Sequence, residues 1–167
     1  MIQIIKPDSP VQEQIKKFSI FLAGSIEMGV AEDWQTKVQQ VLKDYDITIF
    51  NPRRESWDSS WAQSIDNPQF KAQVDWELDH LEKCDLILMY FDENTKSPIS
   101  LLELGAHADN AKMLVCCPPK FFRKGNVDIF CFRKGIPVYE NLEEILTKTK
   151  GLLDIVKHKL VKNISEE

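Results

Sequence analysis

Two glutamates lie at positions where a carboxylate could take part in a reaction, and the first is Glu77. Apolar residues recur at spacings of three and four from about Gln69 to Lys83, which predicts an amphipathic helix. Its apolar stripe comprises Phe70, Val74, Leu78 and Leu81. At about 100° per residue, Glu77 falls on this stripe rather than on the charged side. An unpaired charge is costly to bury, so Glu77 needs partners or a polar cavity. A salt bridge at the core edge is the alternative interpretation.

The second carboxylate is Glu103, in a helix that we expect to begin at Pro98 with Ser97 as its N-cap. Ser100 and His107 fall on the same face, three residues before and four after. A carboxylate near a helix N-terminus can stay ionised and serve as a nucleophile. The alternative interpretation is a surface glutamate on an amphipathic helix.

Three polar segments supply candidate substrate-binding groups. Gly24 and Ser25 follow an apolar run, where a glycine turn and backbone amides can hold polar substrate groups. Asn51 and Arg53 open a long irregular segment that also carries Trp57, which offers a guanidinium and an aromatic face for a planar base. The aromatic and basic run 121–127, which includes Asn126, can line the same cleft, although packing or anchoring explains these residues equally well.

Alternating strands and helices must position these groups. We expect strands at 18–24, 47–50, 85–91, 113–116 and 136–139, with helices from Trp34 onward, at 69–83 and from Pro98. This order predicts a single doubly wound α/β domain of the flavodoxin or Rossmann-like class with a five-stranded parallel sheet. Ligands of such folds bind at the carboxyl ends of the strands. Gly24, Ser25, Asn51 and Asp92 would all lie at that edge.

The ends of the chain differ from the middle. We expect residues 1–17 to form an N-terminal arm, 18–162 the α/β domain and 163–167 a charged tail. Residues 118–135 are interpreted as a connection. Asn141 is expected to cap a C-terminal helix, or a pair of helices divided near Gly151.

Composition excludes several classes of function. The 167 residues carry 21 basic and 26 acidic side chains, a net charge of −5, which argues against nucleic acid as a partner. No apolar stretch is long enough for a membrane span or a signal peptide, so a cytoplasmic location is expected. The four cysteines are interpreted as reduced core thiols. The three histidines show no ligand spacing, so we expect neither a metal nor an organic cofactor.

Several segments resemble the nucleoside 2-deoxyribosyltransferase superfamily. They are Phe21-Leu-Ala-Gly-Ser-Ile, the strand ending at Asp92 and, above all, Ser97-Pro-Ile-Ser-Leu-Leu-Glu-Leu-Gly-Ala. Three others are similar to a less studied subgroup: Asn51-Pro-Arg-Arg-x-x-Trp, Gln73-Val-Asp-Trp-Glu and Phe122-Arg-Lys-Gly-Asn-Val. The resemblance covers roughly residues 18–140.

The resemblance implies a mechanism and roles. Glu103 matches the nucleophile that attacks the anomeric carbon of a 2′-deoxynucleoside and forms a covalent deoxyribosyl ester. Glu77 matches an acidic residue that hydrogen-bonds the base. The implied partners are a small nucleoside or nucleotide and a free nucleobase, without a cofactor, in a homo-oligomer.

Two departures leave alternatives open. The family tyrosine that orients the nucleophile is Phe21 here, and Tyr90 or Ser25 would have to replace it. The classical transferases have an aspartate six residues before the nucleophile, where this chain has Ser97, so Asp92 is the substitute acid. Serine there resembles the branch that hydrolyses 2′-deoxynucleoside 5′-monophosphates. A non-catalytic module that binds a nucleoside or nucleotide is the third hypothesis.

Overall fold

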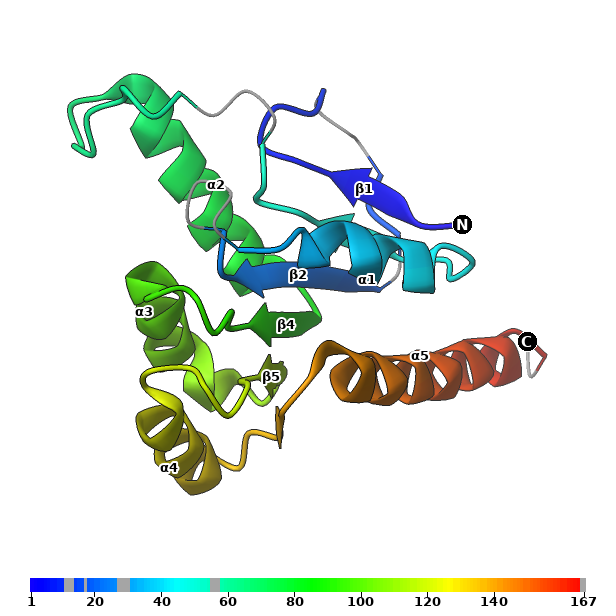
Figure 1. Ribbon diagram of the computed structural model, residues 1–167. Coiled ribbons are helices and arrows are strands. Elements are labelled where there is room, and N and C mark those ends of the chain that lie inside the picture. The colour runs from blue at the N-terminus through cyan, green and yellow to red at the C-terminus, as the bar shows by residue number, and fades with distance from the viewer. Residues whose placement is uncertain (11–13, 17, 27–30, 55–57, 166–167) are drawn as a thin grey trace.

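A parallel β-sheet forms the centre of the molecule (Figure 1). The computed structural model describes residues 1–10, 14–16, 18–26, 31–54 and 58–165. Its six strands follow the order β1-β3-β2-β4-β5-β6, and every neighbouring pair is parallel. They are β1 (Gln3–Ile5), β2 (Ser19–Gly24), β3 (Thr48–Phe50), β4 (Leu86–Tyr90), β5 (Met113–Cys116) and β6 (Val138–Tyr139).

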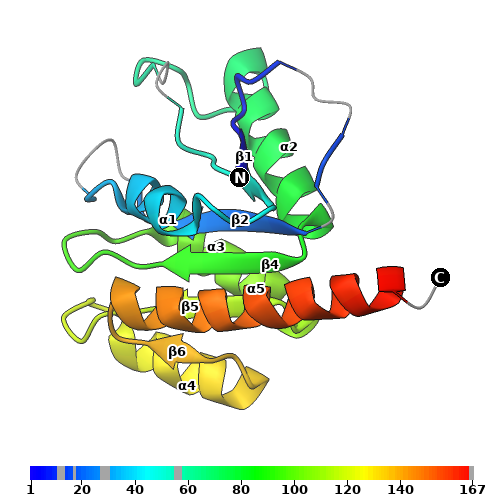
Figure 2. The same cartoon turned by 90° about the vertical axis from the view of Figure 1, so that its right-hand side faces the viewer.

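Helices cover both faces of the sheet, as the alternation of elements predicts. They are α1 (Trp34–Leu42), α2 (Pro68–Lys83), α3 (Pro98–His107), α4 (Lys124–Lys134) and α5 (Leu142–Ser165), with a short 3₁₀ turn, η2 (Ala108–Asn110). The helices α2, α3 and α4 lie on one face, while α1 and α5 lie on the other (Figure 2). The doubly wound α/β fold is therefore confirmed.

Side chains that alternate along the strands divide the core in two. Phe21 and Ala23 of β2 pack on the side of α2, α3 and α4, whereas Ile20 and Leu22 pack on the side of α1 and α5. Both sides are apolar because each is covered by helices. Each strand residue therefore packs on one of the two faces of the sheet. Glu77 of α2 and Glu103 of α3 both lie on the face that α2, α3 and α4 cover.

The sheet has one strand more than the five expected, because β1 lies within the segment that the sequence suggested to be an arm. Gln3 pairs with Thr48, and the backbone N–H of Asn51 donates to Ile5 O at 2.9 Å. Three residues are too few to show a strand period, so only the pairing with β3 reveals this edge strand.

The C-terminal part also differs from the expectation. Residues 118–135 are more than a connection, because they contain α4, of which only Val127 and Cys131 are buried. The C-terminal helix is one element, α5, and is not divided near Gly151. Glycine costs about 1 kcal/mol in a helix, which the burial of Leu146 and Leu153 on α5 offsets.

The inward face of α2 is rotated from the expected stripe. Gln73 and Leu81 are its buried residues, whereas Leu78 is 49% exposed. Glu77 lies four residues after Gln73 and is half-buried. The face of α2 that carries Glu77 therefore also carries the buried amide of Gln73, and it is not wholly apolar as expected.

Candidate active site

Gly24 shapes the carboxyl edge of the sheet. Its φ of +138° lies in a region that residues with a side chain rarely adopt, and a Cβ there would meet Tyr90 O at 2.1 Å. The next residue, Ser25, donates its backbone N–H to the same carbonyl at 2.8 Å. The close approach of β2 and β4 therefore requires glycine and directs Ser25 towards the loop after β4.

Ser25, Thr95 and Ser97 form a buried group that we term the hydroxyl cluster. The Ser25 Oγ lies 2.9 Å from Thr95 Oγ1 and 2.5 Å from Ser97 Oγ, and the last two atoms are 2.7 Å apart. Ser97 occupies the N-cap position of α3 but has a left-handed φ of 46° and makes no side-chain cap. The expected cap is thus replaced by contacts within the hydroxyl cluster.

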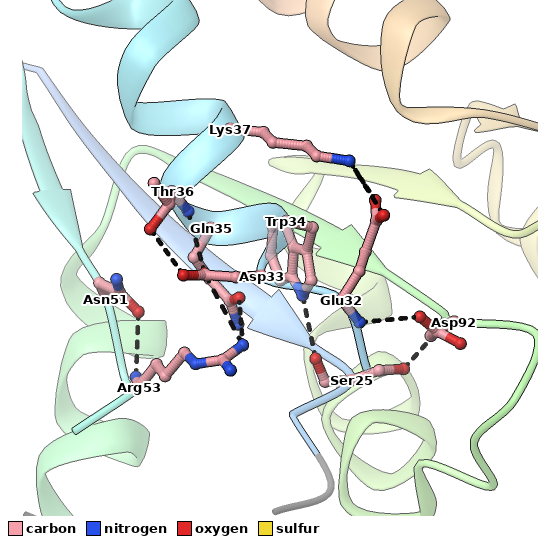
Figure 3. Close-up of polar contacts among 10 residues, drawn as sticks. All are labelled: Ser25, Glu32, Asp33, Trp34, Gln35, Thr36, Lys37, Asn51, Arg53 and Asp92. Atoms are coloured by element: carbon pink, nitrogen blue, oxygen red, sulfur yellow. Dashed lines mark hydrogen bonds and ion pairs between the residues drawn. The ribbon is translucent and has the colours of Figure 1, made fainter. Parts of the chain in front are cut away.

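The carboxylate of Asp92, in the loop after β4, is occupied by hydrogen bonds from neighbouring residues. Its carboxylate accepts a hydrogen bond from Glu32 N at 3.2 Å (Figure 3). It also accepts hydrogen bonds from Asn94 N at 2.8 Å and from Asn94 Nδ2 at 3.2 Å. Its backbone N–H donates to Ser25 Oγ at 2.9 Å. Asp92 therefore connects Glu32, which precedes α1, to Ser25 of the hydroxyl cluster, and this geometry supports a positioning role.

Asn51 and Arg53 lie at the end of β3, beside the start of α1. The Asn51 Oδ1 accepts from Arg53 N at 3.0 Å, and the guanidinium of Arg53 lies 3.4 Å from Gln35 Oε1 and 3.7 Å from Asp33 (Figure 3). Gln35 is fully buried, and its Nε2 has no hydrogen-bond partner among the described residues. The Arg53 side chain thus faces the start of α1 rather than the two glutamates.

Glu77 and Glu103 form a second group, the carboxyl pair, between α2 and α3. Burial raises the pKa of Glu77, against a hydrogen bond that Gln73 donates to it at 2.7 Å. Burial and the charge of Glu77 raise the pKa of Glu103 to about 8. Among the described residues, none donates a hydrogen bond to Glu103. Two carboxyl groups of which one raises the pKa of the other can divide the roles of acid and nucleophile.

Aromatic side chains contribute to the apolar core between the sheet and the helices that carry the carboxyl pair. Phe21 is fully buried, with its ring 6.0 Å from that of Trp76, the residue before Glu77. Apolar side chains of this kind disfavour the charged form of a nearby carboxyl group. Burial beside this apolar core raises the pKa of both Glu77 and Glu103.

Neither proposed substitute for the family tyrosine reaches Glu103. Tyr90 stacks on Trp34 at 5.2 Å on the face of α1 and α5, because strand alternation turns it away from α3. The hydroxyl of Ser25 is bonded within the hydroxyl cluster. In the described part of the chain, neither hydroxyl group donates a hydrogen bond to Glu103.

Some expected residues lie outside these groups, and two residues were missed. Trp57 lies outside the described residues. Asn126 is exposed in the first turn of α4 and makes no hydrogen bond to the described site residues. The sequence reading overlooked Thr95 and Gln73 as site residues. The spacing of four between Gln73 and Glu77 is a signal that would have found Gln73.

Other kinds of site are not evident in the described part of the chain. No group of three or more His, Cys, Asp or Glu residues is arranged to hold a metal ion there. The four cysteines are free and buried, as expected. A shallow hollow lies along α5, lined by residues such as Tyr139, Glu144, Lys148 and Leu152, away from the carboxyl pair. None of the described helices is long and apolar enough to cross a membrane.

Comparisons with known proteins agree with this geometry at the level of family and fold. Residues 17–121 match the family described as "Nucleoside 2-deoxyribosyltransferase like". No curated protein matches the sequence significantly. A crystal structure of a conserved protein from Enterococcus faecalis V583 is similar, with a TM-score of 0.51 and 13% identity over 80% of this chain and 98% of the other. At that identity the likeness concerns the fold alone.

Proposed function

The chain belongs to the nucleoside 2-deoxyribosyltransferase-like family, and we propose that it cleaves the N-glycosidic bond of 2′-deoxynucleosides and transfers the deoxyribosyl group to another base. The observation that carries the proposal is the carboxyl pair: Glu103 is half-buried, receives no hydrogen bond from a described residue and is influenced by Glu77. Family membership supports the general class of reaction, and the carboxyl pair supports the assignment of roles.

The first step forms a covalent intermediate. An oxygen of the Glu103 carboxylate attacks the anomeric carbon, and the bond from that carbon to the base nitrogen breaks. The base nitrogen keeps the electron pair of the broken bond and takes a proton from the carboxyl group of Glu77. The products are a deoxyribosyl ester of Glu103 and a neutral free base. A pair that shares one proton supplies both an acid and a nucleophile.

The second step releases the nucleophile. A nitrogen of the incoming base attacks the anomeric carbon, the ester bond breaks, and Glu103 regains its negative charge. The proton of the incoming base returns to Glu77. Water in place of the base gives hydrolysis with the same balance of protons. The edge residues Gly24, Ser25, Asn51, Arg53 and Ser97 are proposed to border the substrate, together with Trp57, Asn126 and Asp92.

The hydroxyl cluster favours a second candidate, a 2′-deoxynucleoside 5′-monophosphate N-glycosidase. Ser25 and Ser97 present hydroxyl groups beside the N-terminus of α3, which is a suitable place for a phosphate. The described carboxylates make this arrangement less favourable, because Asp92 lies beside Ser25. Both candidates use Glu103 in the same way, so they differ in substrate and acceptor rather than in the first step.

One experiment separates these functions. The protein is incubated with a deoxynucleoside plus a different free base, and separately with a deoxynucleoside monophosphate, and the products are resolved by chromatography. Base exchange supports the transferase. Free base and deoxyribose phosphate from the nucleotide alone support the N-glycosidase, and binding without any product supports a non-catalytic module.

Glu103→Ala tests the nucleophile in whichever reaction is seen. We expect a loss on the order of 10³-fold or more, since the ester cannot form. Glu82→Ala is the matched control, because Glu82 is exposed on α2. Full turnover by Glu103→Ala would show that Glu103 is not the nucleophile.

A homo-oligomer is also proposed. On α3, Ile99 and Leu102 are 60% and 67% exposed, and they lie four residues and one residue before Glu103. Covering these side chains with a second copy would remove apolar surface from water beside the carboxyl pair. Light scattering of the purified protein tests this, and a monomer at all concentrations would contradict it.

A further inference from the structure

Gln73 is a buried amide that joins two parts of the candidate site. It is 4% exposed, and its Nε2 donates to Glu77 Oε1 at 2.7 Å and to Pro52 O at 3.1 Å. Both partners are acceptors, so a flipped amide would place Oε1 against two oxygen atoms. The orientation of the amide is therefore fixed, and Glu77 receives a hydrogen bond that favours its anion.

Within the part of the chain that the structure describes, no side chain donates a hydrogen bond that would stabilise a charge on Glu103. The two arginines after Pro52 pair elsewhere, Arg53 with Asp33 and Arg54 with Asp8. On α3 itself, the pKa of His107 is lowered by burial and by Lys112, so its neutral form is favoured. Among the described residues, Glu77 is the titratable group whose charge acts on Glu103, and it disfavours the charged form.

We propose that Gln73 is a positioning residue that keeps Glu77 ionised in the ligand-free protein and so leaves the remaining proton of the carboxyl pair on Glu103. The inference rests on the proposed function for its catalytic meaning. A hydrogen bond donated to a carboxylate favours the anion, and two carboxyl groups that interact electrostatically release their protons in two steps. Gln73 decides which of the two residues ionises first.

The consequence is a resting site that is not yet nucleophilic. The proton on Glu103 must pass to Glu77 and from there to the departing base, which leaves Glu103 as the carboxylate that attacks. One proton moves and no other reactant is needed. Because Gln73 also holds Pro52 O, the segment Asn51–Arg53 and the protonation of the pair are connected through a single side chain.

The test is a site-resolved titration that needs no turnover. The protein is labelled with carbon-13 at the side-chain carboxyl of glutamate, and spectra are recorded from about pH 4 to about pH 10. Glu77→Gln and Glu103→Gln identify the two signals. In the unchanged protein we expect Glu77 to titrate first and Glu103 second, near pH 8. The reverse order would overturn the proposal.

Gln73→Met removes the donor and keeps a straight side chain of similar size. The expected result is that the titrations of Glu77 and Glu103 approach each other by about one pH unit. Gln35→Met is the matched control, because Gln35 is also a buried glutamine but contacts Arg53 instead, and it should leave both titrations in place. An unchanged separation in folded Gln73→Met would contradict the proposal.

The outcome is independent of whether the proposed reaction occurs. If no deoxynucleoside is cleaved, the order of titration still decides the role of Gln73, and the proposed function alone fails. If Gln73→Met does not fold, as judged from its amide spectrum, the order in the unchanged protein decides the question. Where turnover is seen, Gln73→Met should also move the ascending limb of the pH profile, which a merely structural role would not do.

Discussion

The carboxyl pair and the hydroxyl cluster lie at the same end of the sheet but differ in how their polar atoms are satisfied. In the hydroxyl cluster, Ser25 and its two neighbours bond one another at 2.5–2.9 Å and also hold the N–H of Asp92. In the carboxyl pair, Glu103 has no described donor and a raised pKa. A buried network whose hydrogen bonds are all satisfied stabilises the fold. A buried carboxyl group with a raised pKa and no donor is instead typical of functional sites.

This contrast predicts that catalysis depends most strongly on the carboxyl pair. Glu77→Gln removes the proposed acid, so we expect kcat/KM to fall by about 10²–10⁴-fold. It also removes the negative charge beside Glu103, so the pKa of Glu103 falls below about 8 and the ascending limb of the pH profile moves to lower pH. Steady-state rates between pH 5 and pH 9 measure both effects.

Asp79→Asn is the control for this prediction, because Asp79 is exposed on the same helix and pairs with Lys83 at 3.6 Å. It should change neither the rate nor the profile. An ascending limb that stays in place in Glu77→Gln would show that the two carboxyl groups do not act as a pair.

The next largest effect, on the free energy of unfolding, is expected at Gly24, where β2 and β4 approach each other closely. Gly24→Ala places a Cβ against Tyr90 O in a strained backbone conformation, so we expect a loss of about 3 kcal/mol of unfolding free energy. Urea unfolding measures it. Gly151→Ala is the control, since a Cβ at Gly151 meets nothing within 4 Å, and it should be neutral or stabilising. A Gly24→Ala variant as stable as the unchanged protein would contradict the geometry.

Glu103→Gln should stabilise the protein, in contrast to most substitutions of buried groups. The folded-state pKa of Glu103 is about 8, above its unfolded value, so the folded form binds more protons between about pH 4.5 and pH 8. Stability is therefore lost as pH rises through that window. We expect Glu103→Gln to gain about 2 kcal/mol at pH 8 and little at pH 5, by urea unfolding at both values.

The same measurement has a clear counter-result. If Glu103→Gln is less stable than the unchanged protein at pH 8, the carboxyl group is satisfied in the folded state, and the contrast with the hydroxyl cluster disappears. Asp79→Asn again serves as the control and should show the same pH dependence as the unchanged protein.

The hydroxyl cluster should give the smallest effect, and one that does not depend on pH. Ser25→Ala leaves the backbone N–H of Asp92 without its acceptor, at a cost of about 1–2 kcal/mol. Thr95 and Ser97 still bond each other. Urea unfolding at pH 5 and pH 8 should give equal losses, with exposed Ser59→Ala as the control. A loss that grows with pH would indicate that Ser25 interacts with a titrating group.

Much of the fold followed from local patterns. The strands at 85–91 and 113–116 and the helix from Pro98 are close to β4, β5 and α3, because apolar runs and a proline at the first turn are strong local signals. The edge strand β1 and the helix α4 were missed, since three residues have no measurable period and α4 buries only two side chains.

The candidate site was predictable in its members but not in its connections. Glu77 and Glu103 stood out by type and position, and Ser25, Asp92 and Ser97 were placed at one edge by strand order. Three features depend on contacts between segments that are 56 to 72 residues apart in the sequence: the hydroxyl cluster, the hydrogen bond from Glu32 N to Asp92 and the stacking of Tyr90 on Trp34.

The sequence by itself determined the alternating α/β order, the two glutamates that matter and the family motifs around them. Only the tertiary structure decided that Gln73 also binds Pro52 O, that Glu103 lacks a described donor and that the charge of Glu77 acts on Glu103. The reason is physical: residue type and local period fix which groups a helix presents, but the pKa of a group depends on burial and on charges brought from another helix.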